Sequence, residues 1–172
     1  MRNKFLLSIL FASLPAAAMA HVTLAEPEAK PGAHYLAHFK VGHGCDGSPT
    51  TALSITIPEG VSRVEPQAKP GWKAELVRDG KRVSAVNFSG GTIAANTPDE
   101  FAVAMVLPRT LGPLVFPATQ TCEKGTENWS ELPAADGHKL QNPAPILTVT
   151  KTPSNTMPGM DMKGMDMKGM HM

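Results

Sequence analysis

The sequence has little of what several large classes of protein require. Its 172 residues include two cysteines and nine aromatic residues, of which six are Phe, two Trp and one Tyr. There is no C-x-x-C pair, no G-x-S-x-G nucleophile elbow and no Gly-rich phosphate loop. After the first 20 residues, no apolar run is long enough to span a bilayer. These absences disfavour a thiolate metal site, hydrolytic catalysis and a membrane span.

An excess of charge of one sign is also lacking. The chain has 16 Lys and Arg against 15 Asp and Glu, and removing Arg2 and Lys4 with the leader leaves 14 basic residues. A nucleic-acid binder would show a strong basic excess, so no nucleic-acid partner is expected. The 16 prolines and 15 glycines argue against a helix bundle and favour short strands joined by turns.

The N-terminus has the features of a cleaved secretory leader. Arg2 and Lys4 precede the apolar run 5–14, and residues 18–20 (Ala-Met-Ala) fit the small-x-small pattern of signal peptidase sites. We therefore predict a signal peptide over residues 1–20 and a periplasmic or secreted protein. Cleavage between Ala20 and His21 makes His21 the first residue of the mature chain.

Alternating polarity between residues 21 and 150 predicts one all-β domain. In Ala33–Val41 the residues Tyr35, Ala37, Phe39 and Val41 share one face. Asp79-Gly80 is a favoured hairpin turn between two of the expected strands. Short strands are expected at 33–41, 53–57, 72–77, 82–88, 101–107, 114–116 and 146–149, with 101–107 buried on both faces. This pattern predicts an immunoglobulin-like antiparallel β-sandwich.

The two cysteines, Cys45 and Cys122, lie far apart in the sequence. In an oxidising compartment such a pair is read first as a disulfide, which contributes about 4 kcal/mol in the chain-entropy model. A thiolate metal site is the weaker alternative, since neither cysteine belongs to a C-x-x-C pair.

The composition changes after Lys151, and residues 151–172 form a linker and a Met-rich tail. Gly-Met-Asp-Met-Lys occurs twice and is followed by Gly-Met-His-Met. The tail has no branched aliphatic or aromatic residue, so we expect it to be disordered when empty. Soft thioether ligands select Cu(I), and methionine as adaptable packing filler is the alternative. The expected Cu(I) ligands are Met157, Met160, Met162, Met165, Met167, Met170 and Met172, to which His171 could add a nitrogen.

The predicted cleavage makes His21 a candidate copper ligand. An N-terminal histidine presents its α-amino nitrogen and its Nδ1 to one metal ion in a chelate ring. Because the amine has a pKa of only about 8, copper can displace its proton near neutrality. Two nitrogens suit Cu(II), which heads the divalent affinity order. The alternative is that histidine follows the cleavage site by accident.

Several short motifs, taken in order, resemble one known family. They are His21-Val22-Thr23-Leu24, Pro31-Gly32, Tyr35, Pro49-Thr50-Thr51, Ile57-Pro58-Glu59-Gly60-Val61, Pro70-Gly71-Trp72, Trp129 and Pro143-Ala144-Pro145. Together these residues resemble the YcnI-like copper-binding domain family over residues 21–149. The resemblance implies a secreted immunoglobulin-like domain that binds Cu(II) through a single-histidine brace, completed by a glutamate with a tryptophan nearby.

Carried onto this sequence, His21 matches the brace histidine and Trp129 the neighbouring tryptophan. The glutamate has no counterpart, because the matching stretch 41–48 contains Asp46 as its only carboxylate. Asp46 is the first candidate to complete the site and the imidazole of His43 is the second.

These observations predict a periplasmic copper-binding protein for trafficking or sequestration. Cu(II) would sit at the N-terminal site and Cu(I) on the tail, with a membrane copper transporter or another periplasmic copper carrier as partner. The alternative is a copper-dependent oxidoreductase of the polysaccharide monooxygenase type, which the small number of aromatic residues disfavours. A non-metal adhesion-like module ranks third.

Overall fold

The computed structural model describes residues 21–133, 137 and 139–154, and these residues form strands, turns and loops without any helix. None of them therefore forms a helix long and apolar enough to cross a membrane. The strands are β1 (Val22–Leu24), β2 (Glu28–Ala29), β3 (His34–Val41), β4 (Thr50–Thr56), β5 (Ser62–Pro66), β6 (Lys73–Asp79), β7 (Arg82–Ile93), β8 (Asp99–Val106), β9 (Gly112–Val115), β10 (Ala118–Cys122), β11 (Thr126–Trp129) and β12 (Ile146–Val149).

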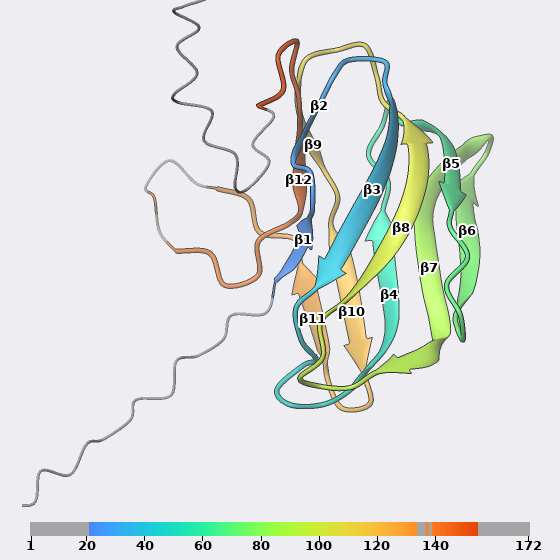
Figure 1. Cartoon of the computed structure of the whole chain (residues 1–172), viewed down its shortest axis with the longest axis vertical. Helices are drawn as coiled ribbons and strands as arrows, with labels where there is room; N and C mark the ends of the chain where they lie inside the picture. Colours follow the sequence, from blue (N-terminus) through green and yellow to red (C-terminus); the bar gives the residue numbers. More distant parts are fainter. Residues whose placement is uncertain (1–20, 134–136, 138, 155–172) are drawn as a thin grey trace, which may run out of the picture.

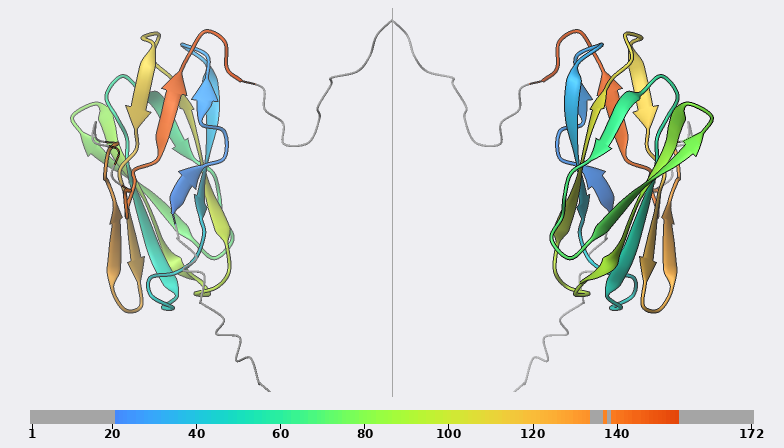
Figure 2. Two further views of the ribbon diagram at one scale, coloured as in Figure 1. Left: turned by 90° about the vertical axis from the view of Figure 1, so that its left-hand side faces the viewer. Right: turned by 90° about the vertical axis from the view of Figure 1, so that its right-hand side faces the viewer.

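Two sheets form the sandwich. One has the order β1-β3-β8-β5 and the other the order β11-β10-β4-β7-β6, and all neighbours within them are antiparallel. Figures 1 and 2 show these sheets as two layers, with the small sheet β2-β12-β9 along one side. Within that small sheet, β12 pairs parallel with β2. The predicted all-β immunoglobulin-like sandwich is confirmed, with this one parallel pair added.

The alternation predicted for β3 is present, and it places every second side chain toward the end of the strand in the core. Ala37, Phe39 and Val41 are fully buried, whereas His34, Leu36 and Lys40 are exposed. Phe39 meets Phe116 edge-on, with the ring centroids 5.6 Å apart. Side chains at every second position point to the same side of a strand, so one apolar face per strand is enough to fill the space between the layers.

The prediction that residues 101–107 are buried on both faces was wrong. Phe101, Val103 and Met105 of β8 are buried, but Ala102 and Ala104 between them are only half-buried. Among the described residues no second layer covers the outer side of this sheet, so the neighbouring side chains of β3 and β5 are what shields the short alanines. The run looked uniformly apolar because alanine is tolerated on a partly exposed face.

The predicted hairpin is confirmed, but its two-residue loop is Gly80-Lys81, one residue later than the predicted Asp79-Gly80. Asp79 pairs with Arg82, and Gly80 has a φ of 59°, the left-handed conformation that glycine adopts without strain. Farther along β7, a Cβ atom on Gly91 would lie 2.3 Å from the indole of Trp72. Trp72 in turn packs edge-on against Phe101, with centroids 4.8 Å apart. Trp72 thus packs against the core.

Cys45 and Cys122 form a disulfide, which confirms the first reading of the two cysteines. The bond joins the loop between β3 and β4 to the end of β10. Both cysteines are buried, at 4% and 6% exposure, so the bond lies inside this end of the sandwich.

Several predictions fall outside the described residues. They are the leader 1–20, the tail from residue 155 with all seven of its methionines, and His171.

Candidate metal centre

His21 immediately precedes β1, whose first residue, Val22, pairs with Val41 of β3. Its imidazole lies beside the indole of Trp129, with ring centroids 5.8 Å apart and planes at 69°. The Nε2 atom of His21 is buried and has no hydrogen-bond partner among the described residues. A buried polar atom without a partner is uncommon in folded proteins and calls for an explanation. The ring is therefore held by packing, with Nε2 directed into the protein.

Trp129 ends β11 and is 4% exposed. Its indole Nε1 donates a hydrogen bond of 3.1 Å to Oε1 of Gln120, which lies on the adjacent strand β10. Aromatic side chains with a polar atom pack well only where that atom finds a partner. This bond sets the orientation of the indole that faces His21.

His43 and Asp46 lie on the loop that the disulfide anchors. Nδ1 of His43 is 2.6 Å from the carbonyl oxygen of Gly44. Because a carbonyl oxygen only accepts, Nδ1 carries the proton, and in the neutral ring Nε2 then carries the lone pair that a metal would use. His43 therefore has a tautomer compatible with metal binding.

Asp46 has a structural role of its own. It has a φ of 44° and the following Gly47 a φ of 78°, while Ser48 N donates to Cys45 O at 2.7 Å. Two successive positive φ angles define a type I′ turn, in which Asp-Gly is a favoured pair. The turn accounts for an aspartate at this position and leaves its carboxylate exposed.

The candidate residues line two separate hollows. One, of about 500 Å³, is lined by His43, Asp46, Glu127 and Trp129 among others. The second, of about 580 Å³, is lined by His21, Lys40, Asp99 and Glu100 among others. The structure thus places His43, Asp46 and Trp129 on one hollow, whereas His21 lines the other and contacts only Trp129 of these three. Among the described residues, no three His, Cys, Asp or Glu side chains are close enough to hold one ion.

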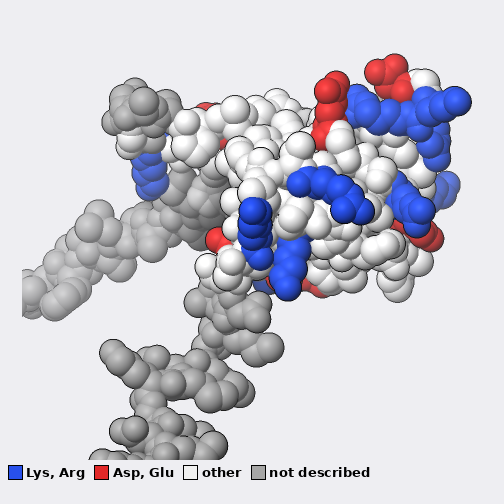
Figure 3. Space-filling model, turned by 90° about the horizontal axis from the view of Figure 1, so that it is seen from above, with Lys and Arg blue, Asp and Glu red and all other residues white. Residues whose placement is uncertain are grey.

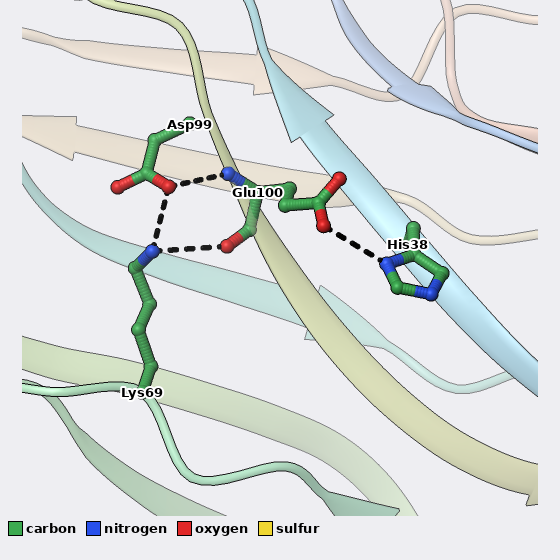
Figure 4. Close-up of polar contacts among 4 residues, drawn as sticks. All are labelled: His38, Lys69, Asp99 and Glu100. Atoms are coloured by element: carbon green, nitrogen blue, oxygen red, sulfur yellow. Dashed lines mark hydrogen bonds and ion pairs between the residues drawn. The ribbon is translucent and has the colours of Figure 1, made fainter.

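The carboxylates beside His21 were not predicted from the sequence. Figure 4 shows that Asp99 and Glu100, at the start of β8, already have side-chain partners. Nζ of Lys69 donates to Oδ1 of Asp99 at 2.7 Å, and Nδ1 of His38 lies 3.1 Å from Oε1 of Glu100. These contacts make both carboxylates weaker candidates for a metal than unpaired ones.

Figure 3 shows Lys and Arg side chains spread over one end of the sandwich. That end carries the turn before β3, whereas Val22 pairs with Val41 at the other end of β3. The positive charge seen in this view therefore lies away from His21, where a cation would bind.

The two packed sheets define the class of protein as an immunoglobulin-like β-sandwich. Residues 21–149 match a family model described as a domain of unknown function (DUF1775). The chain belongs to this family, which is the YcnI-like family that its motifs resemble.

A crystal structure of an uncharacterized protein from Nocardia farcinica, described as revealing an immunoglobulin-like fold, is 29% identical. The match covers 75% of this chain and 97% of that one, with a TM-score of 0.67. A type I cohesin–dockerin complex from Clostridium thermocellum is 12% identical over 77% of this chain and 99% of that one, with a TM-score of 0.46. The cohesin likeness carries no argument about function. No functionally curated protein matches the sequence.

Proposed function

We propose that the mature protein is an exported copper-binding protein that traffics or sequesters copper, with Cu(II) held at His21. The observation that carries this proposal is the position of His21, which immediately precedes β1 and whose imidazole packs against the indole of Trp129. With Nε2 directed inward, Nδ1 is the nitrogen that a chelate with the α-amine would use. Removal of residues 1–20 would supply that amine.

The remaining ligands come from the neighbouring loop. Asp46 and His43 line the hollow beside Trp129. The proposed site needs only the amine, the His21 imidazole and one donor from this loop, so it does not depend on a group of three ligand-type side chains, which the described residues lack. Asp46, an exposed carboxylate, is the first candidate and His43 the second.

In the same proposal the Met-rich tail holds Cu(I) and passes it to a membrane copper transporter or another periplasmic carrier. Ser154, the last described residue, donates its backbone N–H to Oε2 of Glu28, which fixes the tail's point of attachment. Eighteen residues follow it, with a maximal reach of roughly 60 Å. The eight residues of β3 span about 25 Å, so the tail is long enough to reach His21.

The central test compares the mature protein, beginning at His21, with a variant that carries one alanine ahead of it. Electron paramagnetic resonance of the Cu(II) forms should show amine and imidazole nitrogens in the first protein and a changed coordination in the second. Identical spectra and affinities for the two proteins would contradict the proposed chelate.

Two further variants test the other ligands. Asp46→Asn removes the charge but keeps a residue that tolerates the turn, and Glu123→Gln, an exposed carboxylate lining a hollow with Asp46, is its control. Only the Asp46 variant should weaken Cu(II) binding. Deletion of residues 152–172 should abolish Cu(I) capture and leave Cu(II) binding intact, and unchanged Cu(I) binding would refute the role of the tail.

A further inference from the structure

Gln120 is a polar residue at a core position. It lies at the centre of β10, pairs with Leu53 of β4 and Glu127 of β11, and is 1% exposed. A buried amide destabilises a protein unless its donors and acceptor are satisfied. The partners of Gln120 therefore explain why a glutamine is tolerated there.

The amide joins segments that are distant in the sequence. Its Oε1 accepts from Nε1 of Trp129 at 3.1 Å, and its Nε2 donates to the carbonyl oxygen of His43 at 2.8 Å. The second N–H of the amide is directed to Oγ1 of Thr50 at 2.7 Å. The donor capacity and one acceptor site of the amide are thus all in use.

Two of these partners belong to the candidate metal centre. Trp129 contacts the His21 ring, and His43 is on the loop that carries the second set of candidate ligands. The third partner, Thr50, contacts the disulfide and not the candidate ligands: its hydroxyl lies 3.8 Å from Sγ of Cys122. One side chain therefore links the packing surface of His21 to the backbone of the His43 loop.

We propose that Gln120 is a positioning residue of this centre, which holds Trp129 against the His21 imidazole and fixes the start of the His43 loop. This inference rests on the proposed copper-binding function. Residues that orient metal ligands without touching the metal commonly change metal affinity by about 10-fold to 100-fold when they are replaced.

The test uses the mature protein and the variants Gln120→Met and Thr50→Val. Each removes polar atoms from the same buried cluster at nearly constant volume, but only Gln120→Met releases the Trp129 indole. Gln120→Met should raise the Kd for Cu(II) about 10-fold and change the paramagnetic resonance spectrum, whereas Thr50→Val should change neither. In the copper-free protein, the proton resonances of the His21 ring should move in Gln120→Met alone, because the ring current of Trp129 shifts.

A double-mutant cycle identifies the route of the effect. Trp129→Phe removes the Nε1–H donor, so adding Gln120→Met to it should change the copper spectrum and the His21 resonances less than in the wild-type background. Trp129→Phe alone also provides the measurement if Gln120→Met does not fold, as circular dichroism would show.

Failure of the proposed copper-binding function and failure of the positioning role of Gln120 give different results. Absence of Cu(II) binding by the mature wild-type protein overturns the proposed function. Normal copper binding with unchanged affinity, spectrum and His21 resonances in a folded Gln120→Met variant overturns the positioning role and leaves the function standing.

Discussion

Removal of the disulfide should destabilise the domain by an amount that follows from its position in the chain. Cys45 and Cys122 are 77 residues apart, and the chain-entropy model gives about 4.5 kcal/mol for a closed loop of that length. For a domain of this size each kcal/mol lowers the melting temperature by about 3 °C, so a fall of roughly 14 °C is expected. The Cys45→Ala/Cys122→Ala variant also loses the hydrogen bond from Cys45 N to Sγ of Cys122.

The assay is thermal and urea unfolding of the copper-free mature protein. Wild-type protein reduced with a dithiol is the matched control, because it keeps both sulfur atoms and loses only the cross-link. A loss below about 1 kcal/mol in both the reduced protein and the variant would refute the reasoning, since it would mean that the denatured chain gains little freedom. The same variant should bind Cu(II) more weakly if His43 or Asp46 is a ligand.

Other predictions concern single positions. In urea unfolding, Gly44→Ala should lower the free energy of unfolding more than Gly47→Ala. The new Cβ on Gly44 would lie 1.9 Å from the carbonyl oxygen of Ser48, whereas Gly47 has open space around it. Equal losses in the two variants would contradict this reasoning. Burial and, to a lesser degree, Glu26 raise the pKa of Tyr35 above its ordinary value of about 10. The folded state then retains the phenol proton longer than the unfolded state, so the contribution of Tyr35 to stability is constant below pH 10 and falls at higher pH. Since Tyr35 is the only tyrosine, the phenolate absorbance of the native protein reports its titration directly, and an ordinary midpoint would refute the shift.

The sequence was most informative where one face of a strand is uniformly apolar. β3 and β4 were predicted from alternation, and the β6–β7 hairpin from Asp79-Gly80. The strand β10 was not predicted, because its central inward position is Gln120. Only the three partners of the amide make that position acceptable in a core, and two of them, His43 and Thr50, are 77 and 70 residues away. No local pattern can contain that information.

In the candidate site, too, some residues could be identified from the sequence and others only from the structure. His21 was identified from the cleavage pattern, and Trp129 from the order of short motifs. The carboxylates Asp99 and Glu100 reach the surroundings of His21 only because β3 lies between β1 and β8 in one sheet. Strand order depends on contacts between distant segments, so proximity of this kind cannot be inferred from the spacing of residues.

The position of β1 makes the cleavage site a structural requirement of the proposed function. Val22 is 1% exposed and paired with Val41, so only His21 separates the predicted leader from a fixed strand. An amine at residue 21 would therefore be placed by the register of the sheet, next to an imidazole that Trp129 already holds. If the chain began at residue 20, the amine would be one peptide unit, about 3.5 Å, farther from the imidazole, and the ring that joins the amine directly to Nδ1 would not form. If it began at Val22, the imidazole would be lost. The proposed Cu(II) site thus tolerates no displacement of the first residue, and mass analysis of the exported protein should find His21 at its N-terminus.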